Sequence, residues 1–176
     1  VPSHDKGLAM FRLDGRSALI TGGTQGVGAA IAMSLAKGGA NVVLHGLEPT
    51  ESAESTLETC RSFGVAAHAI YHDLSTSTNE TTQLLFQQSL ELFPGLNLLV
   101  NNAGTFREPP FLETSIEAFD RTMRLNVYAG FFLTQVFAQY WVSNQVAGRV
   151  LFTGSINGIL AEPDHVAYDT SKGAVA

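Results

Sequence analysis

The feature that most constrains the fold of this chain is an alternation, repeated five times, of short apolar runs with longer segments of helical periodicity. Each run holds about five residues, the usual length of a strand. Four of the runs are almost wholly apolar, as expected for strands buried on both faces of a parallel sheet. The predicted strands are Ser17–Thr21, Asn41–His45, Ala66–Tyr71, Asn97–Asn101 and Arg149–Thr153.

The intervening segments predict helices, because each parallel strand needs a crossover to the next, and that crossover is usually helical. The alternation therefore indicates an α/β fold with a doubly wound parallel sheet, the Rossmann fold, with strand order 3-2-1-4-5. The sixth strand of a complete fold is missing, so we expect the chain to be incomplete at its C-terminus. The predicted helices are Gln25–Lys37, Thr50–Phe63, Ser77–Leu92, Ser115–Asn144 and one that begins near His165.

We expect one dinucleotide-binding and catalytic domain at residues 11–176. Residues 1–10 contain Asp5 and Lys6 and no apolar stretch of signal-peptide type, so they are interpreted as a native extension or a remnant of cloning. The formal net charge is −6, and no cluster of Lys and Arg is visible, which argues against nucleic acid as a partner.

Cys60 is the single cysteine, so no disulfide can form within the chain. This fits a reducing compartment, and we expect a cytoplasmic protein in which Cys60 is a packed residue rather than a reactive thiol. No apolar run is long enough to span a membrane, so a membrane is not an expected partner.

A glycine-rich turn, Thr21–Gly28, joins the first apolar run to the first helix. Gly22 permits a tight turn, Gly26 lets the backbone approach a pyrophosphate, and Gly28 lets helix and sheet pack closely. The helix N-terminus offers free N–H groups to phosphates. An ordinary turn is the alternative, but the position between strand and helix favours nucleotide binding. The expected cofactor contacts here are Gly22, Thr24, Gln25, Gly26, Val27 and Gly28.

The spacing T-G-x-x-x-G-x-G in this turn, followed by Asn101-Asn102-Ala103-Gly104 after the fourth run, resembles the short-chain dehydrogenase/reductase family. The resemblance covers Leu13–Ala176 in the right order. It implies that Asn102, Ala103 and Gly104 line the cofactor site and that Asp73, with Leu74, lies at the adenine.

The end of the second run decides between NAD and NADP, because an acid there binds the ribose 2′-hydroxyl and an Arg nearby accommodates a 2′-phosphate. The segment Val43–Glu48 has neither at the expected place, and the next Arg is Arg61, well down the following helix. Gln25 stands where NADP-dependent members of the family often have a basic residue. We therefore expect NAD, with NADP as the alternative.

Tyr168 and Lys172 are four residues apart, which places both on one face of the last predicted helix. Oxidising an alcohol releases a hydride to the nicotinamide and a proton that the protein must accept. A free tyrosine has a pKa of about 10. An ammonium about 4 Å away, at an effective dielectric of about 20, favours the tyrosinate by about 4 kcal/mol, or roughly three pKa units. Tyr168 is therefore the predicted acid/base, although such a pair also arises by chance on exposed helices.

The family resemblance implies further roles. Lys172 hydrogen-bonds the nicotinamide ribose, and Ser155 holds the substrate oxygen, where a hydroxyl donor suits growing negative charge. Asn126 matches the family's fourth catalytic residue, which organises a water-linked proton path; its alternative is a helix-interior Asn that bonds nearby backbone. The resemblance also implies a homodimer or homotetramer formed through the long helix and the Tyr168 helix.

The histidines give weaker signals. His68 and His72 lack further ligands for a metal and are interpreted as structural, so no metal is expected. His165 either faces the substrate cleft or lies exposed at the helix start. Phe131, Phe132 and Phe137 are expected in the core or at a subunit contact.

The predicted function is hydride transfer between NAD(P) and a secondary alcohol or ketone of sugar, hydroxyacid or ketoacyl type. The alternative is a non-enzymatic nucleotide-sensing or scaffold protein on the same fold.

Overall fold

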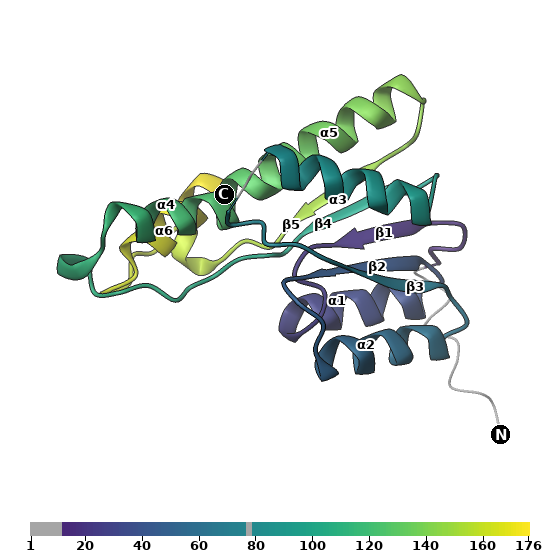
Figure 1. Ribbon diagram of the computed structural model, residues 1–176, viewed down its shortest axis with the longest axis horizontal. Coiled ribbons are helices and arrows are strands. Elements are labelled where there is room, and N and C mark those ends of the chain that lie inside the picture. Colours follow the sequence, from purple (N-terminus) through teal and green to yellow (C-terminus); the bar gives the residue numbers. More distant parts are fainter. Residues whose placement is uncertain (1–11, 77–78) are drawn as a thin grey trace.

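The computed structural model describes residues 12–76 and 79–176 and contains a five-stranded parallel sheet (Figure 1). The strand order is β3-β2-β1-β4-β5, which confirms the predicted fold class and order. Ala18 pairs with Val42 on one side of β1 and with Leu98 on the other. The strands are β1 (Ser17–Ile20), β2 (Asn41–Gly46), β3 (Ala67–Tyr71), β4 (Leu98–Asn101) and β5 (Arg149–Phe152).

Helices cover both faces of the sheet. Helices α1 (Gly26–Lys37) and α2 (Glu51–Ser62) lie on one face, and α3 (Asn79–Leu92) and α5 (Ala129–Ser143) lie on the other (Figure 1). The bounds of α1, α2 and α3 lie within two residues of the predicted ones, whereas α5 is only the last part of the helix predicted at 115–144. Residues 77–78 and the predicted extension 1–10 fall outside the described part.

Local sequence explains where the helices begin and end. The Thr50 hydroxyl caps α2 by accepting a hydrogen bond of 3.2 Å from the Ala53 N–H group, the usual role of Thr at this position. Helix α1 stops at Gly38 and Gly39, and Gly39 has a φ of +98°, which side chains other than glycine rarely adopt. The chain can then turn directly into β2.

The core has two layers because alternate residues of the strands face opposite sides. Leu19 and Val43 pack beneath α3 and α5 together with Leu133 and Phe137. On the other face, Ala18, Ile20, Val42 and Leu44 of the sheet pack against α1 and α2, and Cys60 of α2 belongs to the same cluster. Burial on both faces is the expected property of a parallel sheet. Cys60 is fully buried, as predicted, and burial raises the pKa of its thiol.

Strand β5 departs from this pattern. Val150, Leu151 and Phe152 are exposed although the run is apolar, so the expectation of burial is wrong for this strand. The edge strand β3 is partly buried because α2 and α3 pack on it, whereas within the described residues β4 is the element that packs closely against β5. The exposure of β5 therefore follows from the lack of closely packed helices on its faces in the described part of the chain.

The predicted helix at 115–144 is divided into three consecutive segments. Helix α4 (Ile116–Met123) passes into a single π-helical stretch, η3 (Arg124–Tyr128), before α5 begins. Such π-helical turns insert an extra residue into the helix and are frequent at functional sites. Periodicity alone cannot reveal the interruption, because the apolar residues continue through it.

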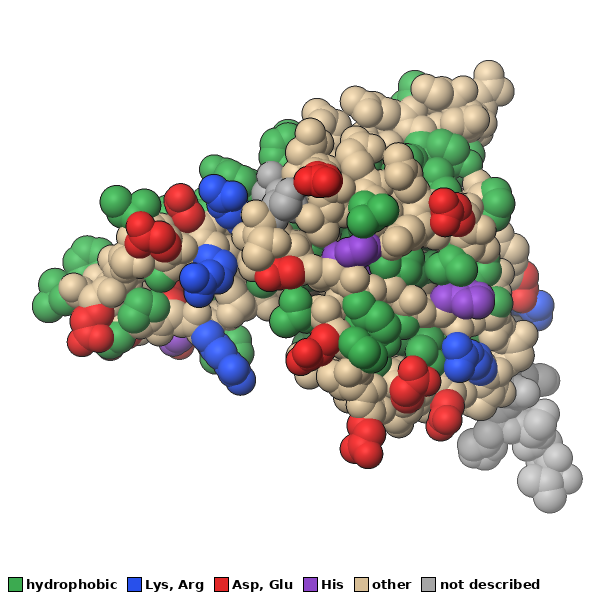
Figure 2. Space-filling model, viewed as in Figure 1, with side chains coloured by type: hydrophobic (Ala, Val, Ile, Leu, Met, Phe, Trp, Pro, Cys, Tyr) green, Lys and Arg blue, Asp and Glu red, His purple; other side chains and the backbone are tan. Residues whose placement is uncertain are grey.

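Beyond the carboxyl ends of β4 and β5, helices α4 and α6 (Val166–Val175) form an arm with two short 3-10 turns (Figure 1). The turns are η2 (Phe111–Glu113) and η4 (Ile156–Gly158). Hydrophobic side chains gather at the end of this arm in the view of Figure 2, where Lys and Arg stand among Asp and Glu. The exposed apolar residues of the arm include Phe111, Leu112, Ile116, Ile159 and Leu160. In the described ranges, no helix has the length and apolarity needed to cross a bilayer.

Two phenylalanines on α5 allow a test of this packing. Phe137 is 0% exposed and Phe131 is 59% exposed. Phe137→Ala leaves a cavity between α5 and the sheet, so we expect the free energy of unfolding to fall by about 3–5 kcal/mol. Phe131→Ala, the matched control, is expected to change it by less than about 1 kcal/mol. Urea denaturation measures both, and equal losses would contradict the assignment of Phe137 to the core.

Candidate active site

A cleft of about 390 Å³ opens at the carboxyl ends of β1, β4 and β5. It brings together the glycine turn, the segment after β4 and the helix that carries Tyr168, three parts of the chain that are far apart in sequence. Eleven of the predicted site residues line it: Gly22, Thr24, Gln25, Gly26, Val27, Gly28, Asn102, Ala103, Gly104, Tyr168 and Lys172. It is also lined by Thr105, Phe106, Thr153 and Gly154, which were not predicted.

The glycine turn has the conformation that its sequence predicts. Gly22 has a φ of +61°, in the region that favours glycine. A Cβ on Gly28 would lie 2.0 Å from the Gly22 carbonyl oxygen and 2.6 Å from the Asn102 amide nitrogen, so no side chain fits there. A Cβ on Gly26 would meet nothing within 4 Å, so this backbone faces open space. The turn can therefore receive a bulky group against its backbone.

Asn102 joins the glycine turn to the two neighbouring strands. Its amide nitrogen donates to the carbonyl oxygens of Thr21 (3.1 Å) and Gly22 (3.2 Å), and its amide oxygen accepts from the Thr153 hydroxyl (3.1 Å). The Thr21 hydroxyl in turn accepts from the N–H groups of Asn102 (2.9 Å) and Ala103 (3.0 Å). These bonds fix the ends of β1, β4 and β5 relative to one another.

His45, at the end of β2, is a further support of the turn that the sequence did not reveal. Its Nδ1 accepts a hydrogen bond of 3.4 Å from the Gly22 N–H group, and its Nε2 donates to the His72 carbonyl oxygen at 3.0 Å. The acceptor role of Nδ1 requires the neutral ring, with the proton on Nε2. Burial lowers the pKa of His45 to about 4, because the charged ring would lose its hydration.

Tyr168 and Lys172 lie on the same side of α6, as predicted, and both face the cleft. The Lys172 Nζ atom lies 5.7 Å from the centroid of the Tyr168 ring and donates to the Thr153 carbonyl oxygen at 2.8 Å. Lys172 is 7% exposed, and burial lowers the pKa of its ammonium. One cation therefore lies beside the phenol in a largely desolvated position.

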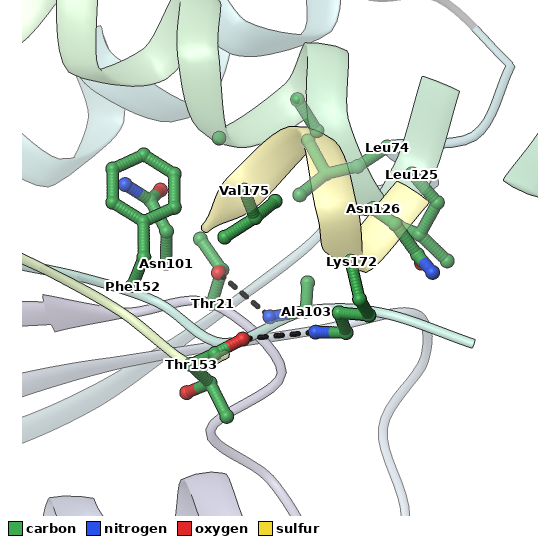
Figure 3. Close-up of a pocket in the computed structure, with 12 residues that line it drawn as sticks. Thr21, Leu74, Asn101, Ala103, Leu125, Asn126, Phe152, Thr153, Lys172 and Val175 are labelled. Atoms are coloured by element: carbon green, nitrogen blue, oxygen red, sulfur yellow. Dashed lines mark hydrogen bonds between the residues drawn. The ribbon is translucent and has the colours of Figure 1, made fainter. Parts of the chain in front are cut away.

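Asn126 and Leu74 do not line the cleft but a small enclosed cavity behind it, of about 10 Å³, which Lys172 also lines (Figure 3). The Asn126 amide is fully used: its oxygen accepts from the Thr105 N–H group at 2.8 Å, and its nitrogen donates to the Thr105 carbonyl oxygen and the Ser171 hydroxyl, both at 2.9 Å. Asn126 thus ties the π-helical turn to the loop after β4 and to α6.

Ser155 is not among the residues that line the cleft. Its hydroxyl accepts from the Asn157 N–H group and donates to the Asn157 amide oxygen, each at 3.2 Å, and so caps η4. Asp73 is also outside the cleft, where its carboxylate accepts from the N–H group and the hydroxyl of Ser75.

Glu108, in the loop after β4, is a second residue that sequence reasoning missed. Its side chain is 4% exposed, and one carboxylate oxygen accepts the Tyr168 backbone N–H group at 3.0 Å. The other oxygen lies 3.7 Å from His165 Nδ1, and the ring of His165 is edge-on to the ring of Tyr168. An acid at a helix N-terminus satisfies a free N–H group, so Glu108 secures the first turn of α6. No pattern of spacing connects residues this far apart.

The end of β2 carries no cation. Leu47 is 65% exposed there, and Glu48 follows it. Arg61 donates two hydrogen bonds to the Ala67 carbonyl oxygen, at 3.1 and 2.9 Å, and so does not face the cleft.

Two histidines on and after β3 have structural contacts. His72 bonds Gln88 at 2.8 Å, and His68 packs edge-on against Phe93, which agrees with the structural roles predicted for them. Within 12–76 and 79–176, no group of three metal-ligating side chains exists.

Comparison with known proteins agrees with this geometry. A family model described as short chain dehydrogenase matches residues 16–176, and the chain belongs to that family, as its motifs predicted. The chain is 32% identical to L-rhamnose 1-dehydrogenase (NADP(+)) of Thermoplasma acidophilum over 166 aligned residues. The aligned region covers 94% of this chain and 65% of that protein.

Two solved structures are also similar. A short chain dehydrogenase from Burkholderia cenocepacia J2315 in complex with NADP has a TM-score of 0.84 and 32% identity, over 93% of this chain and 65% of that one. NAD+-bound xylitol dehydrogenase has a TM-score of 0.83 and 27% identity, over 92% of this chain and 61% of that one. The chain thus spans 61 to 65% of the length of these three relatives.

The buried His45 predicts a dependence of stability on pH. Its pKa is about 4 in the folded protein against 6.5 as its ordinary value, so the unfolded chain binds more protons between these two pH values. His45 therefore contributes about 3 kcal/mol to the free energy of unfolding. This contribution is fully present above pH 6.5 and is lost as the pH falls through 4.

His45→Asn keeps an acceptor for the Gly22 N–H group but does not titrate. Between pH 7 and pH 4, the free energy of unfolding of both proteins should fall. We expect the loss in His45→Asn to be smaller than the loss in the wild type by about 3 kcal/mol. His68→Asn, at an exposed position of β3, is the matched control. Denaturation at a series of pH values measures the difference, and parallel curves for the wild type and His45→Asn would refute the assignment.

Proposed function

We propose that the protein is an oxidoreductase that transfers a hydride between a nicotinamide cofactor and a secondary alcohol or ketone, with Tyr168 as general acid/base. One observation carries this proposal: Tyr168 and Lys172 line the same cleft as the glycine turn. The family membership supports it, since the named relatives include dehydrogenases.

The residues of the cleft fit a dinucleotide. The backbone of Gly26 faces open space beside the N-terminus of α1, which offers N–H groups to a pyrophosphate. Asn102, Ala103 and Gly104 line the middle of the cleft, and Lys172 would hold the nicotinamide ribose. The bound cofactor would supply the hydride acceptor or donor. Asp73 and Leu74 lie outside the cleft. We propose on the family resemblance alone that they contact the adenine of the cofactor.

Lys172 would place a positive charge beside Tyr168, where the proton is transferred. The Lys172 Nζ atom lies 5.7 Å from the centroid of the Tyr168 ring, so its positive charge faces the phenol within the cleft. The hydrogen bond to the Thr153 carbonyl oxygen keeps the ammonium in place. During oxidation, the deprotonated Tyr168 oxygen would accept the proton of the alcohol as the hydride goes to the cofactor. During reduction, the Tyr168 hydroxyl would give that proton to the carbonyl oxygen.

Ser155 and Asn126 complete the proposed catalytic set. The Ser155 hydroxyl would donate its proton to the substrate oxygen in place of the Asn157 amide oxygen, while its own oxygen still accepts from the Asn157 N–H group. Asn126 would act through the segments it joins, since its amide is fully bonded to Thr105 and Ser171. The small cavity beside Asn126 and Lys172 is about large enough for one water molecule on a proton path.

We further propose NAD as the preferred cofactor. Among the described residues that line the cleft, Lys172 is the one Lys or Arg. Neither the exposed Leu47 nor the Glu48 carboxylate would balance a 2′-phosphate. The named relatives include proteins of both cofactor types. The proposed substrate is a small sugar, hydroxyacid or ketoacyl compound, and the proposed assembly is a cytoplasmic homodimer or homotetramer.

Removing one hydroxyl tests the mechanism. Tyr168→Phe in the full-length protein is expected to lower kcat/KM at least about a hundredfold, because no group remains to transfer the proton. Tyr128→Phe removes an exposed phenol outside the cleft and is the matched control. Reduced cofactor absorbance with a panel of alcohols measures both. Dinucleotide binding without turnover of any alcohol or ketone would instead support the sensing or scaffold function.

The cofactor preference has its own test. We expect kcat/KM with NAD to exceed that with NADP by at least about tenfold, because the 2′-phosphate would meet no cation. Leu47→Arg places a guanidinium after β2 and should raise kcat/KM with NADP. Leu84→Arg, a similar change at an exposed position of α3, serves as control. A wild-type preference for NADP would overturn the assignment.

A further inference from the structure

Asn157, in the 3-10 turn η4, connects the two segments that carry the proposed catalytic residues. On one side, its amide oxygen and backbone N–H group both bond the Ser155 hydroxyl at 3.2 Å. On the other side, its amide nitrogen donates to the carboxylates of Asp169 (2.8 Å) and Glu162 (3.0 Å). Asp169 directly follows Tyr168 on α6.

We propose that Asn157 is a positioning residue, which fixes the Ser155 hydroxyl relative to the Tyr168 phenol by linking η4 to α6. This inference rests on the proposed function, because it assigns a role at the same site. Asn157 itself does not line the cleft, so its effect passes through the residues that it holds.

Two independent features hold η4 and α6 in register. The second Asp169 oxygen accepts the Glu162 N–H group at 2.8 Å, which binds the loop between the turn and the helix to the same carboxylate. At Gly158, a Cβ would lie 2.8 Å from the Lys172 carbonyl oxygen, so the turn already rests on the backbone of α6. The side chain of Asn157 therefore acts at a direct contact between two rigid elements.

The chemistry of an amide is specifically required at residue 157. The amide oxygen accepts from a hydroxyl while the amide nitrogen donates to carboxylates, and only a group with both an acceptor and donors can do this. A carboxylate in its place would still accept from Ser155, but it would repel Asp169 and Glu162. The link would then break on the α6 side alone.

This polarity permits an exchange experiment. Asn157→Asp removes the donor, and the double variant Asn157→Asp with Asp169→Asn restores the bond in the opposite direction. In the double variant, the amide nitrogen at 169 donates to the carboxylate at 157, and the amide oxygen at 169 still accepts the Glu162 N–H group. Asn157→Ala removes the link without adding charge. Asn144→Asp, at the exposed residue that directly follows α5, adds the same charge away from the link and is the control.

Activity is the first measurement. We expect Asn157→Ala and Asn157→Asp to lower kcat by about tenfold to a hundredfold, while the dissociation constant of the cofactor changes less than about threefold. The double variant should be more active than Asn157→Asp, because it restores the bond between 157 and 169 and leaves only the repulsion with the exposed Glu162. Asn144→Asp should behave as the wild type.

Amide hydrogen exchange gives a second measurement that does not depend on turnover. Exchange across 153–165 should become faster in Asn157→Asp and return to the wild-type rate in the double variant. A wild type that turns over no substrate would contradict the proposed function, whereas this exchange pattern would still report on the link.

Several results would overturn the inference. Unchanged kcat in both single variants of Asn157 would do so, as would a double variant that folds but is no more active than Asn157→Asp. If both single variants fail to fold, Asn157 is a structural residue and the proposal is wrong.

Discussion

The structure depends on one constraint: the carboxyl ends of parallel strands must meet at one edge of the sheet, and the order of the strands decides which ends are neighbours. Here β1 lies between β2 and β4, so the helices that follow β1 and β4 leave on opposite faces. This divergence opens the cleft. The Asn102 side chain holds its three strand ends together through bonds to Thr21, Gly22 and Thr153.

Two buried ionisable side chains lie at or beside the cleft, and burial changes their pKa values. His45 and Lys172 are both largely removed from water, and in both cases burial lowers the pKa. The consequences differ because their partners differ. His45 is neutral with both ring nitrogens bonded and serves as a fixed support. Lys172 has a carbonyl partner and lies beside the ring of Tyr168 in the cleft.

Helix α6 is held from three directions, which matters because it carries the proposed acid/base. Glu108 binds its first turn, Asn126 bonds Ser171 near its middle, and Asn157 bonds Asp169. Each contact comes from a different loop or helix. The orientation of Tyr168 therefore depends on segments that lie up to 60 residues away in sequence.

The sequence by itself determined the fold class, the strand order, the glycine turn and the pairing of Tyr168 with Lys172. These features are encoded locally: periodicity sets each element, and residues four apart on a helix share a face. Only the tertiary structure decided the contacts of His45, Glu108 and Asn157, the π-helical interruption at Asn126, and the exposure of β5. These depend on contacts between distant segments, and a hydrogen bond between such segments leaves no periodic signal in the chain.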